Sequence, residues 1–295
     1  MMSNSSPVLG FIGLGSMGNG MARNVAAKHD GPVHAFDLSP DALEKVVAAG
    51  ALPGNSIADI AAACDFVFLS LPGGKQVASV CVDIARHARA GTTVVDLSTT
   101  SVAESRAIHA DLAAKSIAFA DAPVARARAA ADAGTLSIMV GASKDLFARI
   151  EPLLRYMGTD INLCGEVGCG QVVKLINNSL LFVHVAALAE MMVVGERAGV
   201  SNQTLLDVLS ISSADSFALR NHGMKAMLAR AFPEKAFPMD YTLKDMGYAL
   251  ELSQQAGVDA KLAKLAATYY QQGIEAGIGA KYFPAIIELI EEAGK

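Results

Sequence analysis

The sequence predicts an α/β plus all-α fold, in which a doubly wound parallel sheet is followed by a helical domain. Apolar runs alternate with amphipathic stretches through the first half of the chain. These runs are apolar throughout, as in strands that are covered on both faces of a sheet. After Gly165 the pattern is helical almost to the end of the chain. We therefore expect a sheet domain over residues 1–167 and an all-α domain over residues 168–295.

The apolar runs predict the strands, and the amphipathic stretches predict the helices between them. Strands are expected at Val8–Gly13, Val33–Phe36, Phe66–Leu71, Thr93–Leu97, Ile117–Asp121 and Leu136–Gly141. Helices are expected at Met17–Lys28, Asp41–Ala48, Gln76–Ala88 and Ala103–Lys115. A further helix over Lys144–Met157 and a short strand near Ile161 should complete this domain. Such alternation implies right-handed connections and a mostly parallel sheet.

The helical half opens with one long helix. Residues Gly168–Ala198 contain no Pro and would span roughly 45 Å as a single interdomain helix. His184 and Glu190 interrupt its most apolar tract, so we expect a buried helix and no membrane span. A spine this apolar predicts burial against a second copy, in a homodimer or homotetramer. Further helices are expected at Gln203–Ser210, Asn221–Ala231, Met239–Ala256, Lys261–Ala276 and Pro284–Glu292.

Composition excludes several classes of function. The net charge of −5 provides no basic surface for nucleic acid. Met1–Pro7 is short and polar and does not resemble a targeting peptide, so we expect a cytoplasmic protein. The four cysteines form no CxxC pair and have no histidine at metal-ligand spacing. Free thiols and no metal site are therefore expected.

The stretch from Gly13 to Gly18 predicts a dinucleotide site because its structural context is complete. An expected strand precedes Gly13-Leu14-Gly15-Ser16-Met17-Gly18, an expected helix follows it, and Asp37 ends the next strand. In Rossmann-type domains these glycines permit a tight turn, close approach of a pyrophosphate, and close packing of helix on strand. Asp37 is placed to bind both ribose hydroxyls of NAD and to repel the phosphate of NADP. Two alternatives remain: a turn without a ligand, and Asp37 as the cap of the next helix.

Other expected strand ends also carry polar or turn residues. Leu71-Pro72-Gly73 could lay backbone against a cofactor or be an ordinary turn, and Ser98 or Ser101 could cap a helix. Ser98 and Thr99 could instead reach a nicotinamide ribose or a substrate. On the long helix Lys174 and Asn178 are four residues apart and share a face with Gln171. Lys174 is either a buried functional cation or a solvated lysine near a helix start.

From Leu9 to about Glu292 the chain resembles the β-hydroxyacid dehydrogenase family, whose best-known member is 3-hydroxyisobutyrate dehydrogenase. The resemblance rests on GFIGLGSMGNGMARN at Gly10–Asn24, DLSTTSV at Asp96–Val102, DAPV and GTLSIMVG within Asp121–Gly141, and GCGQVVKLINN at Gly168–Asn178. LKDMGYAL at Leu243–Leu250 matches a later Lys-Asp segment. Such enzymes move a hydride between NAD(P) and the β-hydroxyl of a small acid. Their all-α domain dimerises.

The resemblance implies roles for particular residues. Lys174 would be the catalytic acid and base, and Asn178 would orient the reacting oxygen. Thr99 would contact the nicotinamide half, Lys244 would reach the cofactor, and Asp245 would hold the Lys244 segment in place. The complete expected cofactor set is Gly13, Leu14, Gly15, Ser16, Met17, Gly18, Asp37, Leu71, Pro72, Gln76, Thr99 and Lys244. The complete expected substrate set is Ser98, Thr99, Ala125, Arg126, Ala127, Lys174, Asn177 and Asn178.

One departure from the family pattern bears on the substrate. The family has Ser-Gly-Gly after Asp-Ala-Pro-Val, whereas this chain has Ala125-Arg126-Ala127. A guanidinium suits an oxyanion, and a similar Arg occurs in 3-sulfolactaldehyde reductases. The alternative is a surface charge, which is what we expect of Arg128.

The predicted activity is therefore NAD-dependent oxidoreduction of a small anionic β-hydroxy acid or aldehyde. Sulfolactaldehyde, tartronate semialdehyde, β-hydroxy amino acids such as serine or phenylserine, and 3-hydroxyalkanoates all remain open as substrates. A catalytically silent nucleotide-binding module is the alternative of another class. An imine reductase is a third, although those enzymes usually lack the Lys.

Overall fold

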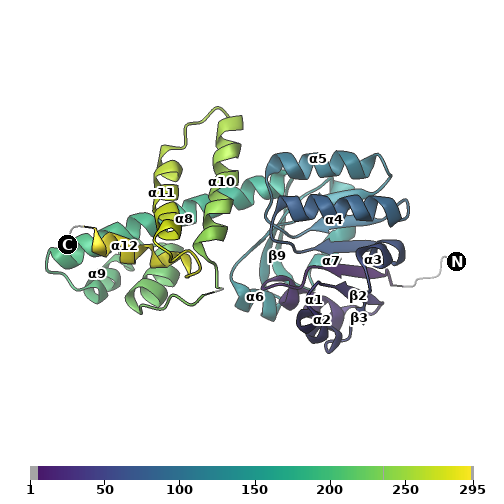
Figure 1. The fold of residues 1–295 in the computed structure, drawn as a ribbon, viewed down its shortest axis with the longest axis horizontal. Helices are drawn as coiled ribbons and strands as arrows, with labels where there is room; N and C mark the ends of the chain where they lie inside the picture. The colour runs from purple at the N-terminus through teal and green to yellow at the C-terminus, as the bar shows by residue number, and fades with distance from the viewer. Residues whose placement is uncertain (1–5, 235, 294–295) are drawn as a thin grey trace. The chain divides into compact units, whose positions relative to one another are not determined.

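The computed structural model describes residues 6–234 and 236–293. It divides into two units, residues 1–174 and 175–295, with the boundary inside one long helix. The change to a helical pattern in the sequence predicted this boundary at residue 168, at the start of that helix. Figure 1 shows the strands and their covering helices in the first unit and helices alone in the second. This confirms the predicted fold class.

The first unit is built on one nine-stranded sheet. Its order is β3-β2-β1-β4-β5-β6-β8-β7, with β9 paired to β8. The strands from β1 to β6 pair in parallel, whereas β8 runs antiparallel to β6 and β7. The strands are β1 (Leu9–Ile12), β2 (Val33–Phe36), β3 (Leu52–Pro53), β4 (Phe66–Leu69), β5 (Thr93–Asp96), β6 (Ala118–Asp121), β7 (Val124–Ala125), β8 (Leu136–Gly141) and β9 (Gly158–Gly165). The order reverses between β2 and β4 on either side of β1, which is where open α/β sheets bind ligands.

Helices cover both faces of this sheet. They are α1 (Gly18–Lys28), α2 (Pro40–Val47), α3 (Ile57–Ala63), α4 (Gly74–His87), α5 (Val102–Ala113), α6 (Arg128–Ala133) and α7 (Lys144–Leu154). Successive residues of β4 face two different hydrophobic cores. Phe66 and Phe68 lie in the core that includes residues of α1 and α7. Val67 and Leu69 lie in the core that includes residues of α3, α4 and α5. Burial on both faces explains why the strands are continuous apolar runs.

Serine side chains determine where many of the helices start. Ser39, Ser56, Ser101, Ser143 and Ser201 each accept a hydrogen bond from the backbone N–H three residues later. At Ser101 the bond is reciprocated by the Glu104 side chain, which forms a capping box. Of the two serines considered as caps after β5, Ser101 is therefore the cap.

The described residues of the second unit form helices, connecting loops and one isolated β-bridge between Pro238 and Tyr282, and no strand. This unit contains most of α8 (Cys169–Arg197), followed by α9 (Asn202–Leu209), η1 (Leu219–Leu228), α10 (Met239–Gln255), α11 (Lys261–Glu275), η2 (Phe283–Ala285) and α12 (Ile286–Glu292). Phe182, Tyr270 and Phe283 are packed edge-to-face at its centre, and the Tyr270 hydroxyl donates to the Phe182 carbonyl at 3.0 Å. The segment around Asn221 is a π-helix and not the α-helix expected from its periodicity.

Helix α8 is long and apolar enough, by length and composition alone, to cross a membrane. The interruptions at His184 and Glu190 therefore do not shorten the tract as much as the sequence suggested. A single helix of this kind is also typical of the core of a soluble protein, and α8 contributes Phe182, Val185 and Met192 to the core of the second unit.

Candidate active site

The glycine turn after β1 has the geometry of a dinucleotide-binding turn. Gly13 has φ +92°, and a Cβ there would overlap the Ser70 carbonyl oxygen. A Cβ on Gly18 would overlap the Gly13 carbonyl oxygen, whereas a Cβ on Gly15 would meet no described atom within 4 Å. The backbone of the chain thus excludes side chains at Gly13 and Gly18. The open space at Gly15 fits the close approach of a pyrophosphate.

The start of α1 completes this cradle. Its N-cap position, Met17, provides no side-chain hydrogen bond to the first turn. The first amides of a helix have no partner within the helix and carry the positive end of its dipole. An uncapped first turn beside a Gly-rich loop suits a bound phosphate. The residues from Gly13 to Gly18 therefore fit the dinucleotide that the sequence predicts.

Asp37 lies directly behind the glycine turn. Its Oδ2 accepts from the Leu14 N–H at 2.5 Å, and its Oδ1 accepts from the Ser39 N–H at 2.7 Å. Ser39, and not Asp37, caps α2. Each carboxylate oxygen keeps a second lone pair, so Asp37 can brace the turn and still accept hydrogen bonds from ribose hydroxyls.

The loops after β4 and β5 are joined by Ser98. Its Oγ accepts from the Leu71 N–H at 2.9 Å, and its own N–H donates to Asp96 Oδ1 at 3.0 Å. Only 4% of Ser98 is exposed, while Thr99 beside it is half-buried. Ser98 therefore holds the two loops together, and Thr99 is the more open residue of the predicted pair. Among the other expected cofactor residues, Pro72 and Gln76 are exposed and Leu71 is half-buried.

The first turn of α8 is fixed by a carboxylate from β6. Asp121 Oδ1 accepts from the Gly168 N–H at 2.6 Å, and Oδ2 accepts from the Gln171 N–H at 2.8 Å. Burial raises the pKa of the Asp121 carboxyl to about 6, against the lowering effect of these backbone hydrogen bonds. The role of Asp121 was not predicted from the sequence, although a carboxylate at the end of an expected strand, within a block that matches the family, indicates such a role.

Lys174 and Asn178 lie one turn apart on the same face of α8. Lys174 is 8% exposed and Asn178 is 5% exposed. Burial of a lysine this deeply excludes the interpretation of Lys174 as a solvated lysine. A charged side chain is rarely buried unless it is paired or functional.

In the second unit, neighbouring side chains hold the Asn178 amide. Its Nδ2 donates to Asp245 Oδ2 at 2.7 Å, and its Oδ1 accepts from Asn177 Nδ2 at 3.1 Å. Asp245 is 2% exposed, and its Oδ1 lies 3.0 Å from Lys244 Nζ. The Lys244 ammonium also lies over the rings of Tyr241 and Tyr248. Asp245 therefore positions both a predicted substrate residue and a predicted cofactor residue.

The loop after β7 carries Arg126 in an unusual backbone conformation. Its φ is +82°, a region that favours glycine, which the family has in this segment. The guanidinium donates to the Thr135 carbonyl at 2.5 Å, to Thr159 Oγ1 at 3.1 Å and to Asp160 Oδ2 at 2.6 Å. Hydrogen bonds from Thr159 and Arg126 hold the pKa of Asp160 below its usual value. Arg126 and Asp160 are both about half exposed, so an incoming anion can compete for this guanidinium.

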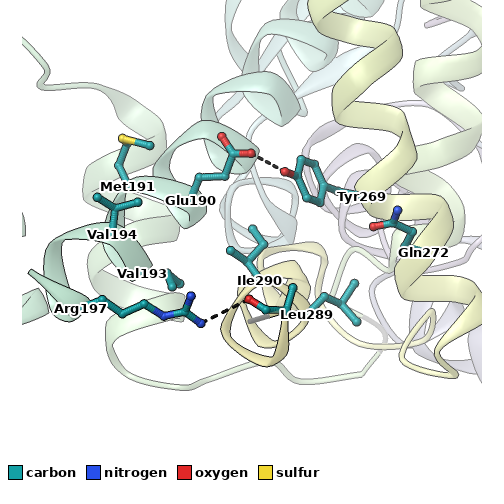
Figure 2. Close-up of a pocket in the computed structure, with 10 residues that line it drawn as sticks. Glu190, Met191, Val193, Val194, Arg197, Tyr269, Gln272, Leu289 and Ile290 are labelled. Carbon is teal, nitrogen blue, oxygen red and sulfur yellow. Dashed lines mark hydrogen bonds between the residues drawn. The ribbon is translucent and has the colours of Figure 1, made fainter. Parts of the chain in front are cut away.

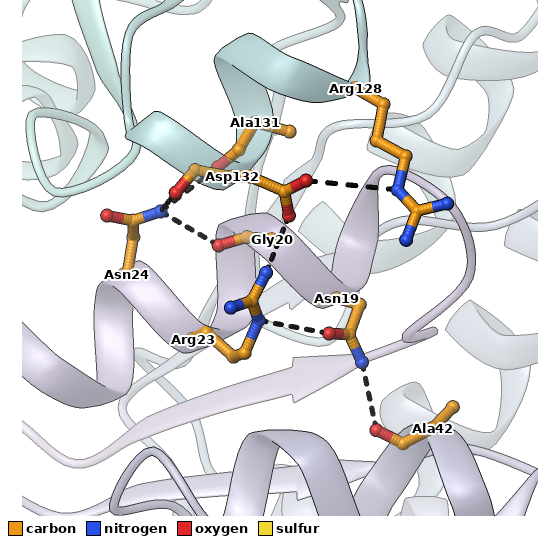
Figure 3. A network of polar contacts seen from close by, with 8 residues as sticks. All are labelled: Asn19, Gly20, Arg23, Asn24, Ala42, Arg128, Ala131 and Asp132. Carbon is orange, nitrogen blue, oxygen red and sulfur yellow. Dashed lines mark hydrogen bonds and ion pairs between the residues drawn. The ribbon is translucent and has the colours of Figure 1, made fainter.

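Helix α6, which follows this loop, is attached to α1 by a polar network (Figure 3). Arg23 pairs with Asp132 at 2.5 Å, and the Asn24 amide donates to the carbonyl oxygens of Ala131 and Asp132. Arg128 extends from α6 toward Asp132 at 3.8 Å and is 70% exposed. The segment predicted to bind substrate, Ala125–Ala127, is thus held on one side by the pairing of β7 with β8 and on the other by the attachment of α6 to α1.

The second unit also contains a cavity of about 450 Å³ (Figure 2). Side chains of α8, α11 and α12 line it, among them Glu190, which accepts a hydrogen bond from the Tyr269 hydroxyl. None of the predicted catalytic or substrate residues lines this cavity. Among the described residues, no three His, Cys, Asp or Glu side chains gather as a metal site requires.

Comparisons with known proteins find matches to both parts of the chain. Residues 8–168 match the family described as the NAD binding domain of 6-phosphogluconate dehydrogenase. Residues 168–290 match the NAD-binding family of NADP-dependent 3-hydroxyisobutyrate dehydrogenase. The sequence is 36% identical to 2-(hydroxymethyl)glutarate dehydrogenase of Eubacterium barkeri, covering 96% of this chain and 95% of that protein. It is 32% identical to NAD-dependent L-serine dehydrogenase of Pseudomonas aeruginosa, covering 96% and 97%. The solved structure of Mycobacterium tuberculosis 3-hydroxyisobutyrate dehydrogenase with L-serine has a TM-score of 0.90 and 30% identity, covering 97% and 99%.

Proposed function

The chain belongs to the 3-hydroxyisobutyrate dehydrogenase-like family of NAD-dependent hydroxyacid dehydrogenases, and we propose that its own substrate is a small β-hydroxy acid with an anionic end. The observation that carries this proposal is that Lys174 is a buried residue, one helical turn from the buried Asn178, whose amide is held by Asp245. An ammonium and an amide on one face can both hydrogen-bond a single carbonyl or hydroxyl oxygen. The relatives named above act on 2-(hydroxymethyl)glutarate and L-serine, and both compounds fit this class.

The proposed mechanism assigns proton transfer to Lys174. In reduction its ammonium donates a proton to the carbonyl oxygen, and in oxidation its amine takes the proton of the hydroxyl. The Asn178 amide donates to the same oxygen and fixes its direction. The glycine turn, Asp37 and Thr99 would hold the dinucleotide, whose nicotinamide would supply or accept the hydride.

We also propose that NAD is preferred over NADP. Asp37 places a carboxylate behind the glycine turn, where the extra phosphate of NADP would be repelled. The following residues, Leu38, Ser39 and Pro40, provide no cation to offset that repulsion.

A substrate panel tests the proposed activity directly. Purified protein is incubated with NAD or NADP and with β-hydroxy acids, β-hydroxy amino acids and hydroxy sulfonates. In the reverse direction it is given NADH with tartronate semialdehyde or 3-sulfolactaldehyde. NADH absorbance should report turnover with at least one anionic member and little with neutral alcohols of the same size. Turnover with neutral alcohols alone would contradict the proposed substrate class.

Arg126→Ala should lower kcat/KM for the best anionic substrate at least tenfold and change the low kcat/KM for a neutral alcohol of the same size by less than threefold. A charge-assisted hydrogen bond to an anion is worth about 1.5–3 kcal/mol, which corresponds to roughly a tenfold or larger change in affinity. Arg128→Ala is the matched control, because Arg128 is an exposed Arg of the following helix. Equal effects of Arg126→Ala on both substrates would remove Arg126 as the anion anchor.

We propose that the protein is a homo-oligomer in which α8 contacts a second copy. Ile176, Leu180, Met191 and Val194 are each about half exposed, and their spacing places them along one face of α8. Met191 and Val194 also border the cavity of Figure 2, which gives a partner's side chain a place to insert. The double substitution Leu180→Glu and Val194→Glu should reduce the particle mass measured by light scattering to that of one chain. Leu262→Glu, on the exposed side of α11, should leave the mass unchanged, and an unchanged mass in both variants would contradict this interface.

A further inference from the structure

The buried side chain of Gln171 joins the first turn of α8 to the loop after β5. Its Nε2 donates to the Ser98 carbonyl at 2.8 Å, and its Oε1 accepts from the Thr100 N–H at 3.2 Å. None of Gln171 is exposed to solvent. One amide therefore binds the backbone on both sides of Thr99, the residue that the family pattern assigns to the nicotinamide half of the cofactor.

The loop that Gln171 binds is itself fixed to the sheet. Ser98 Oγ accepts from Leu71 after β4, and Thr100 Oγ1 lies 2.8 Å from Ser105 Oγ in α5. Both bonds involve buried groups. Gln171 thus connects α8 to a loop that cannot shift without breaking these contacts.

The backbone of the same helical turn is fixed by Asp121 from β6. The Asp121 carboxylate accepts from the Gly168 and Gln171 backbone amides, so the backbone of Gln171 is held from β6 and its side chain by the loop after β5. A Cβ on Gly170 would lie 2.8 Å from Asp121 Oδ2 and would overlap the Met139 carbonyl oxygen. The helix therefore has little room to slide or rotate at this turn.

Lys174 follows Gln171 by three residues and lies on the same face of α8. We propose that Gln171 is a positioning residue that sets the place of the Lys174 ammonium relative to the Ser98–Thr100 loop. This inference rests on the proposed role of Lys174 as the proton donor and acceptor. A misplacement of about 1 Å at a reacting group costs roughly 100-fold in rate, so the bonds of Gln171 are expected to affect turnover more than cofactor binding.

Gln171→Met tests the proposal because it keeps the length of the side chain and removes both hydrogen bonds. We expect kcat, expressed per NADH-binding site, to fall about 10- to 100-fold, while the Kd of NADH changes by less than threefold. Counting NADH-binding sites by fluorescence titration removes the contribution of unfolded protein. Gln203→Met is the control, since it makes the same substitution at an exposed glutamine of α9 whose amide donates to Asp207. Its kcat per site should stay within threefold of the wild-type value.

Gln171→Glu gives a second readout that does not depend on how Gln171→Met folds. A protonated carboxyl can still donate to the Ser98 carbonyl and accept from Thr100, whereas the ionised form has no donor. The ratio of its kcat to that of the wild type should therefore rise as the pH falls. A ratio that does not change with pH, or a kcat of Gln171→Met within threefold of the wild-type value, would overturn the positioning role. Normal turnover in a Lys174 variant would instead overturn the proposed function itself.

Discussion

Lys174→Ala is expected to lower kcat by two to four orders of magnitude and to leave the Kd of NADH close to the wild-type value. General acid and base catalysis by a positioned group contributes about 10²- to 10⁴-fold to a rate. Lys174 is almost completely buried on α8, on the face that Gln171 fixes to the Ser98–Thr100 loop. The dinucleotide is expected to be bound chiefly by the glycine turn and Asp37, so its affinity should survive the loss of the ammonium.

Two further variants make this expectation specific. Lys174→Arg keeps the positive charge, but a guanidinium does not release its proton near neutral pH, so it should be as inactive as Lys174→Ala. Lys264→Ala removes an exposed lysine that pairs with Asp259 on the surface and should have normal kinetics. Steady-state NADH absorbance measures kcat, and NADH fluorescence titration measures Kd. Loss of NADH binding with turnover intact would contradict the assignment of Lys174.

The parts of the fold that the sequence predicted are those in which burial determines the sequence pattern. The strands expected at Val33–Phe36 and Leu136–Gly141 were found with the same bounds: all of the second except Ser137 is buried, and the first is buried at Val33 and Ala35. The elements that were missed are short: β3 and β7 contain two residues each, and α3 and α6 contain seven and six. Elements of this length show too few turns or alternations for periodicity to identify them.

The candidate site likewise contains features that could be predicted from the sequence and features that could not. The glycine turn and the Lys174–Asn178 face were predictable because each depends on spacing along one element. The hydrogen bond between Ser98 and Leu71 and the contacts of Asp121 and Gln171 with distant residues connect positions 27 to 73 apart. A local sequence pattern does not indicate which distant residues form hydrogen bonds with each other. The Arg126 side chain was expected to meet an anion, and its pairing with Asp160, 34 residues later, likewise required the register of β7, β8 and β9.

Asp37→Asn is expected to change the preference between the two cofactors by about 100-fold or more, measured as the ratio of kcat/KM with NAD to kcat/KM with NADP. The substitution keeps the shape of the side chain but removes its charge. Hydrogen bonds from hydroxyls to a charged group are worth about 1.5–3 kcal/mol, so NAD should lose roughly 10- to 100-fold in affinity. NADP should gain, because the repulsion between its phosphate and the carboxylate disappears.

The ratio of the two kcat/KM values distinguishes cofactor selection by Asp37 from its structural role in bracing the glycine turn. Asp37 also accepts the amides of Leu14 and Ser39, so a variant that only loosened the turn would lose both cofactors to the same extent. A fall in both kcat/KM values with an unchanged ratio would therefore show that Asp37 is structural and does not select the cofactor. Asp41→Asn is the matched control, since Asp41 is an exposed acid in the first turn of α2. The ratio of kcat/KM with NAD to kcat/KM with NADP should be the same for Asp41→Asn as for the wild type. The carboxylate that hydrogen-bonds the glycine turn is that of Asp37, and Asp41→Asn leaves it in place.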